Sequence, residues 1–217
     1  MESLTPGELF YNVRKAIRLV YEFQMRMQST VFLIKSLLKI GGRVEVNKLY
    51  SKSPVLSKSY GETQMYHDNW AWDYIYPMAM EYHLDNWKIK PDKEIRISLV
   101  QVADDGFYRA AANGDSPDRL NTGTYMPAAD SDSWLLFVME IRDRDTRFAN
   151  RWNRNDMEQN LNKWMKDQRL IIDEKTSAGN PFIVMKFPLT DLMGELGISK
   201  TIDTVKKYIE KVYGLKM

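Results

Sequence analysis

The sequence predicts an α+β fold, in which a long N-terminal helix and an aromatic-rich helix pack with a largely antiparallel sheet of about four strands and a C-terminal amphipathic helix. Two observations lead to this prediction. Apolar residues recur with a helical period near both ends of the chain, whereas between residues 94 and 187 they alternate or form unbroken runs, as in strands. The resulting order of helix, helix, strand, strand, helix, hairpin and helix is typical of α+β proteins.

The whole-chain composition limits the classes of function. The chain has 217 residues, and we expect a helix over residues 1–42 and a single α+β domain over residues 43–217, which includes an aromatic-rich segment over residues 60–90.

Charged residues make up 28% of the chain but nearly cancel to +2, so no global field favours nucleic acid or an anionic membrane. Because there is no cysteine, disulfides, thiolate zinc sites and iron–sulfur clusters are excluded. No signal-peptide pattern or long apolar run is present, so we expect a cytoplasmic protein without a membrane partner.

The first element is expected to be one helix that begins near Thr5, has Pro6 in its first turn, and ends at Gly41 and Gly42. Its apolar residues follow an uninterrupted 3-4 spacing, the pattern of an a/d seam, and only Gln24 breaks the apolar character. We expect this seam to form an interface, and its residues are Phe10, Val13, Ile17, Val20, Gln24, Met27, Val31, Ile34 and Leu38.

The length of this helix leaves two interpretations open. A helix of this span would be roughly 50 Å long, whereas a compact domain of this size has a radius of gyration of about 17 Å. One domain can hardly cover all of it. The helix is therefore either a core helix of its own subunit, with a break near Ser29 and Thr30, or an oligomer or partner-protein seam in which Gln24 sets the register.

The following segments contain the highest aromatic density of the chain. Residues 43–59 are expected to be a polar connector, and residues 60–87 a helix that Pro77 kinks. The tyrosine and tryptophan side chains of this helix suit either a core or a recognition surface. A small ring ligand, such as a nucleobase or a sugar, is expected to stack on Trp70, Trp72 and Tyr74 if the segment is a recognition surface.

The second half of the chain supplies the sheet and two more helices. Strands are predicted from residue 94 to 102 and from 134 to 141, and a hairpin over residues 169–174 and 182–187. A helix capped by Asn155 follows the second strand, and a last helix runs from about Ser199 to Gly214. The residues expected to be buried by these two helices are Met157, Leu161, Trp164, Ile202, Val205, Ile209 and Val212.

Two acidic features indicate an alternative, enzymatic function. Asp104 and Asp105 end a predicted strand, and Gly106 can close a hairpin after them, an arrangement that resembles the acidic hairpin of polymerase palm domains over about four residues. Glu140 lies in the most apolar strand, with Arg142 on the same face. Carboxylates in such places can hold Mg²⁺ or Mn²⁺, although an Asp-Gly hairpin and an ordinary ion pair explain the same residues.

A basic stretch follows this strand. Arg142, Arg144, Arg147, Arg151 and Trp152 combine guanidinium groups with a stacking ring, which suits phosphate and base recognition, so nucleic acid is one candidate partner. Interspersed aspartates instead favour a salt-bridged surface loop. The two histidines, His67 and His83, have neighbouring aspartates but no convincing third metal ligand, so no metal site is expected there.

The favoured function is therefore a non-catalytic binding or regulatory protein that needs no cofactor and that oligomerises, or joins a larger protein assembly, through its N-terminal helix. The alternative is a divalent-metal-dependent enzyme that acts on nucleic acid or nucleotides through Asp104, Asp105 and Glu140.

Overall fold

The computed structural model describes residues 5–49, 79–118, 121–143 and 152–215. The helices are α1 (Pro6–Leu37), α4 (Gly106–Ala112), α5 (Arg154–Lys166) and α6 (Gly194–Tyr213), with short 3-10 turns at Thr122–Thr124 and Leu189–Leu192. The strands are β1 (Glu45–Leu49), β2 (Ala79–Lys88), β3 (Lys93–Val102), β4 (Trp134–Asp143), β5 (Ile171–Lys175) and β6 (Pro181–Pro188). The fold is thus α+β, as predicted.

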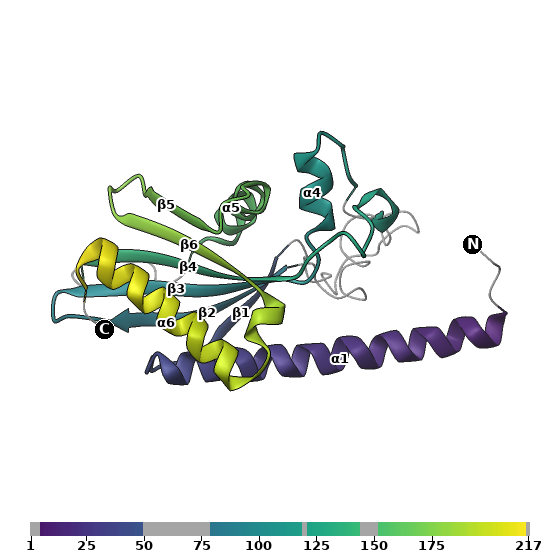
Figure 1. Cartoon of the computed structure of the whole chain (residues 1–217), viewed down its shortest axis with the longest axis horizontal. Coiled ribbons are helices and arrows are strands. Elements are labelled where there is room, and N and C mark those ends of the chain that lie inside the picture. The colour runs from purple at the N-terminus through teal and green to yellow at the C-terminus, as the bar shows by residue number, and fades with distance from the viewer. Residues whose placement is uncertain (1–4, 50–78, 119–120, 144–151, 216–217) are drawn as a thin grey trace, which may run out of the picture.

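In the described part of the chain, six strands form one antiparallel sheet in the order β1-β2-β3-β4-β6-β5 (Figure 1). The four predicted strands are its centre and one edge. The prediction missed β1, which lies in the expected connector, and β2, which lies in the expected aromatic helix. Residues 50–78, which hold most of that helix, fall outside the described residues.

The expected helix was wrong from residue 79 onward because β2 alternates between the two faces of the sheet. Met80, Tyr82 and Leu84 belong to the core on one face, whereas Glu81 and His83 point to the other. A register shift follows His83, where Asp85 takes a positive φ of 77°. This irregularity hides the alternation from a reading of the sequence.

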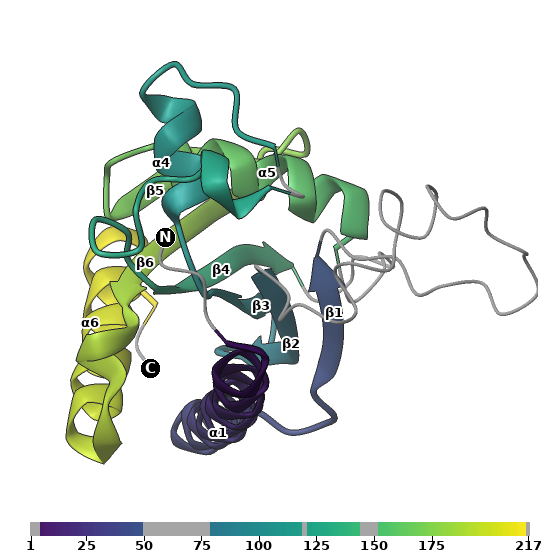
Figure 2. The same ribbon diagram turned by 90° about the vertical axis from the view of Figure 1, so that its right-hand side faces the viewer.

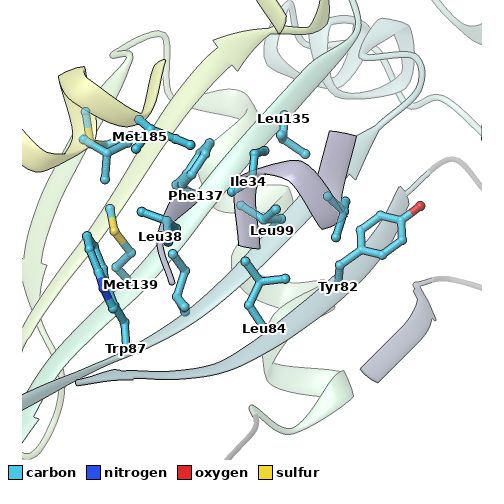
Figure 3. Close-up of a cluster of buried hydrophobic side chains, with 14 of the residues drawn as sticks. Ile34, Leu38, Tyr82, Leu84, Trp87, Leu99, Leu135, Phe137, Met139 and Met185 are labelled. Atoms are coloured by element: carbon cyan, nitrogen blue, oxygen red, sulfur yellow. The ribbon is translucent and has the colours of Figure 1, made fainter. Parts of the chain in front are cut away.

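Helices cover both faces of the sheet (Figure 2). The second half of α1 and the whole of α6 pack on one face, where Ile34 and Leu38 meet side chains from β2, β3, β4 and β6 (Figure 3). Helices α4 and α5 pack on the opposite face, where Trp164 and Tyr108 are fully buried beside Val100 and Val138. The fold therefore has three layers, with the sheet in the middle.

Helix α1 forms as one unbroken element, as one of the two interpretations requires. Thr5 and Glu8 form a capping box at its start, and Pro6 is its first residue. The helix has 32 residues, which corresponds to about 48 Å. Its first half extends beyond the sheet (Figure 1), and every residue from Thr5 to Glu22 is exposed.

The remaining elements follow the prediction in outline, but α5 begins at Arg154, so Asn155 lies inside the helix and does not cap it, and α6 begins at Gly194, five residues before Ser199. The β5–β6 hairpin is present, Met157, Leu161 and Trp164 of α5 are buried, and α6 ends at Gly214, which has a left-handed φ of 65°. Val212, expected to be buried, is instead 47% exposed. Gly106, expected to close a hairpin, instead begins α4.

Candidate functional site

The first candidate site is the first half of α1, Pro6–Glu22, which we call the projecting half. Four residues of the predicted seam lie on it, and their exposed fractions are 61% for Phe10, 45% for Val13, 64% for Ile17 and 39% for Val20. Leu9 and Tyr21, which flank the seam, are also exposed, as are Tyr11 and Leu19 on the side of the helix that carries Lys15. Isolated exposed apolar residues are common, whereas the apolar residues of the projecting half form a continuous row.

The same seam continues without a slip into the core of the chain. Met27, Val31, Ile34 and Leu38 are at most 5% exposed and pack on the sheet. These four residues of the expected interface therefore pack against the sheet of their own chain and are not exposed to a partner. Among the described residues, the part of the seam that remains exposed is the projecting half.

Gln24 marks the point where α1 meets the sheet. Its Nε2 donates a hydrogen bond to Met80 Sδ at 3.7 Å, and its Oε1 lies 3.5 Å from the Tyr82 hydroxyl. The same hydroxyl lies 3.0 Å from Oε1 of Gln101. Burial raises the pKa of Tyr82 to about 12, so the hydroxyl stays protonated and donates. Contacts within the chain thus account for the polar residue that interrupts the seam.

Charged side chains occupy a different side of the projecting half. Lys15 lies with its Nζ 5.4 Å from the centre of the Tyr11 ring, and Arg14 and Arg18 are also exposed. Glu8 is held by the capping box, where hydrogen bonds from Thr5 lower the pKa of its carboxyl. The seam side of the projecting half is therefore apolar, whereas the side that carries Lys15 mixes charged and apolar residues, and neither side contacts the sheet.

A second feature, which the sequence analysis missed, is a buried polar network on the α5 face of the sheet. The Ser98 hydroxyl donates to Glu81 Oε1 at 2.8 Å, and Asn47 Nδ2 donates to Glu81 Oε2 at 3.1 Å. Ser98 Oγ also lies 3.1 Å from His83 Nδ1. Because the Ser98 proton points at Glu81, the His83 Nδ1 must carry the proton in this contact. Burial lowers the pKa of His83, which is therefore neutral at pH 7.

Two buried ion pairs extend this network. Arg96 pairs with Glu140 at 2.5 Å, and its guanidinium lies 4.0 Å from the centre of the Trp152 ring. Asn180 Nδ2 donates to the other oxygen of Glu140 at 3.0 Å. Next to this pair, Arg142 Nε donates to Glu94 Oε1 at 2.9 Å. The charges of both arginines are thus matched by carboxylates within the sheet.

A groove of about 480 Å³ between α5 and the β5–β6 hairpin is lined by four of these side chains, Arg96, Glu140, Arg142 and Asn180. Trp152, Trp164 and Phe182 line its walls, and the rings of Trp164 and Phe182 stack with centroids 5.7 Å apart. Glu140 is the candidate catalytic residue found here, and Arg142 and Trp152 are the candidate binding residues. Each of the three already has a partner within the chain.

The other two candidate acids lie elsewhere. Asp105 is buried next to α4, where it accepts hydrogen bonds from the Asp132 backbone N–H and the Trp134 ring N–H, each at 2.8 Å. Asp104 accepts from the Gly106 N–H at 2.7 Å. Trp134 and Glu140 are six residues apart along β4, about 20 Å in a strand. The three acids of the enzymatic alternative therefore do not share a site, and the described residues contain no cluster of three potential metal-ligating side chains.

Several predicted binding residues fall outside the described residues. They are Trp70, Trp72, Tyr74, Arg144, Arg147 and Arg151. Of the predicted basic stretch, Arg142 and Trp152 are described, and each contacts a different partner, Glu94 for Arg142 and Arg96 for Trp152. A signal for the missed network was present in β3, because Arg96 and Ser98 alternate with buried isoleucines and therefore share one face of the sheet.

Comparison with known proteins places the chain in a family. No curated protein and no solved structure matches it. Within the described residues, no helix has the length and apolar character needed to cross a membrane. The PM0109 family model matches residues 5–214, nearly the whole chain, and the chain therefore belongs to the PM0109 family.

Proposed function

We propose that this protein is a non-catalytic assembly protein that associates, with itself or with a partner protein, through the projecting half of α1. The observation that carries this proposal is the exposure of Phe10, Val13, Ile17 and Val20 on a helix whose later seam residues are buried. Apolar side chains are stabilised by removal from water. A partner that covered the projecting half would bury its apolar side chains, as the sheet already buries those of the second half of α1.

The way in which the helix is held supports this role. An isolated helix of about 17 residues is marginally stable in water. The projecting half continues from a segment that the sheet holds in place through Val31 and Ile34, and the Thr5 capping box closes its free end. The surface is therefore already ordered before a partner binds, which lowers the entropic cost of association.

The enzymatic alternative receives less support. It requires Asp104, Asp105 and Glu140 to act together, but Asp105 and Glu140 lie near opposite ends of β4. Glu140 is held by Arg96 and Asn180 within the chain. The separation of the acids and the internal partners of Glu140 therefore give no support to nucleotide binding by these three residues.

The proposal is tested by light scattering coupled to size exclusion over a range of protein concentrations. Val20→Glu places a charge in the exposed seam, and we expect it to dissociate an assembly that the unmodified chain forms. Lys15→Glu changes an exposed residue of the same helix that lies outside the seam and serves as the matched control, so it should leave the assembly intact. A chain that is monomeric at every concentration would overturn the proposal, as would an assembly that Val20→Glu leaves unchanged.

A further inference from the structure

The partner of the projecting half can be specified further, an inference that rests on the proposed function. We propose that the partner is a second copy of this chain, and that the two projecting halves pack antiparallel. The two-fold axis passes between the two helices at the level of Lys15. Three features of α1 lead to this arrangement: the position of the sheet, the length of the exposed segment and the distribution of seam residues.

The sheet prevents a parallel, in-register arrangement. From Met27 onward the seam side of α1 is covered by the strands of its own subunit. A parallel partner helix would follow the same side of α1 and would meet these strands after about residue 24. Figure 1 shows that the first half of α1 extends beyond the sheet of its own chain. In an antiparallel pair the sheet of the second copy would therefore lie beyond the start of α1, and the partner would contact only the projecting half.

The length of the exposed segment matches this overlap. In an antiparallel pair centred on Lys15, residues whose numbers add up to 30 lie opposite one another. Pro6, the first helical residue, then lies opposite Gln24 of the second copy. Gln24 is the residue whose hydrogen bonds to Met80 and Tyr82 mark the start of the covered half. The second helix therefore fills the free length of the seam and ends where the sheet begins.

The seam residues are compatible with this pairing. Phe10 lies opposite Val20 of the second copy, and Val13 lies opposite Ile17, so each layer joins apolar side chains. Near the axis, Ala16 provides a small side chain on the flank of the seam, which allows the two backbones to approach closely. Lys15 points away from the partner. The seam can therefore serve as its own complement, which a two-fold interface requires.

The arrangement also closes on itself. In a two-fold dimer both copies use the same surface, so neither projecting half remains free for a third chain. The two domains then lie at opposite ends of a rod made of the overlapping helices. We therefore expect a defined dimer rather than a filament.

Spin-label distance measurements on the full-length chain test the orientation. Since the chain has no cysteine, Lys15→Cys and Ser36→Cys each provide a single labelling site on an exposed residue. In the antiparallel dimer the labels at position 15 lie near the axis, within about 30 Å of one another given helix diameters of 10–12 Å. Those at position 36 are separated by about 60 Å, because each lies 21 residues from the axis at a rise of 1.5 Å per residue.

The possible results separate this inference from the proposed function. A short distance at position 15 with a long distance at position 36, lost in a Val20→Glu background, is the expected result. Short distances at both positions would show a parallel dimer, which overturns this inference and leaves the proposed function standing. Single-exponential decay without a dimer distance at either position, together with a monomer in light scattering, would overturn both. Unchanged far-ultraviolet circular dichroism confirms that each labelled variant is folded.

Discussion

At the scale of single residues, the buried network shows how the chain accommodates polar side chains inside its sheet. Glu81, His83 and Ser98 are at most 3% exposed, yet each has a hydrogen-bond partner. Satisfied polar groups can be buried at small net cost, whereas losing one partner leaves the other desolvated. The network therefore makes the stability of the sheet depend on a few specific protonation states.

The neutral state of His83 leads to a pH-dependent prediction. Burial lowers the pKa of His83 in the folded chain, whereas the unfolded chain keeps the ordinary value near 6.5. The unfolded state therefore binds the proton more tightly, and the contribution of His83 to stability is present above pH 6.5 and is lost as the pH falls. Urea unfolding of the unmodified chain and of His83→Gln should show a difference in free energy that shrinks between pH 7 and pH 5. A constant difference over this range would contradict the prediction.

The Arg96–Glu140 pair leads to a second prediction. Because both side chains are at most 13% exposed, Glu140→Gln removes the neighbouring carboxylate of a guanidinium that water cannot easily solvate. Breaking a buried pair in this way typically costs about 3 kcal/mol. Glu174→Gln, which breaks the more exposed pair with Lys163, serves as the control and should cost less than about 1 kcal/mol. Denaturant unfolding measures both, and equal losses would show that burial does not set the strength of the pair.

At the scale of elements, the sequence was most informative where one period dominates. The helix of α1, the alternation in β3 and the inward face of α5 were identified correctly because each pattern repeats over several turns or residues. Strand β2 was missed because Tyr82 also fits a helical spacing of four from Met78, and the register shift after His83 interrupts the alternation. A local pattern cannot choose between two such periods, whereas pairing with β1 and β3 does.

The polar network could not be predicted for a related reason. Its members come from five different parts of the chain: β1, β2, β3, β4 and the turn before β6. Glu81, Arg96 and Glu140, for example, each belong to a different strand. Only the order of the strands brings these residues together. Asp104 and Asp105 show the converse, since neighbouring acids in the sequence are used for local hydrogen bonds around α4.

The start of α6 provides a prediction about a single element. An alanine in place of a helical glycine usually stabilises a helix by about 1 kcal/mol. At Gly197 a Cβ atom would clash with the backbone carbonyl of Asp191, so Gly197→Ala should instead destabilise the chain by about 1–3 kcal/mol. Gly7→Ala, in the first turn of α1, meets open space and is the matched control. Thermal unfolding should show a lower midpoint for the first variant only, and a higher midpoint for Gly197→Ala would contradict the close packing of α6.

At the scale of the whole molecule, the apolar seam of α1 runs without interruption from an exposed half of the helix into a half that is buried on the sheet. The sequence shows a uniform seam, but the extent of the sheet determines that Ile34 is inside and Ile17 outside. These two isoleucines are 17 residues apart on the same helix, so they allow the folding role of the seam to be separated from its assembly role. Removing side-chain atoms at each position should affect different measurements.

Ile34→Ala creates a cavity in a fully buried site, and we expect a loss of about 2–5 kcal/mol at any protein concentration. Ile17→Ala removes apolar surface that is exposed in the single chain, so under the proposed assembly its effect should depend on concentration. If assembly occurs through the projecting half, the unmodified chain should unfold at a higher temperature as its concentration rises, because association stabilises the folded state by mass action. In Ile17→Ala this dependence should weaken, while the midpoint of the dilute sample stays within about 1 °C of the unmodified chain. Scanning calorimetry over a hundredfold range of concentration measures both effects, and an equal loss for Ile17→Ala in dilute samples would mean that the projecting half belongs to the core of its own subunit.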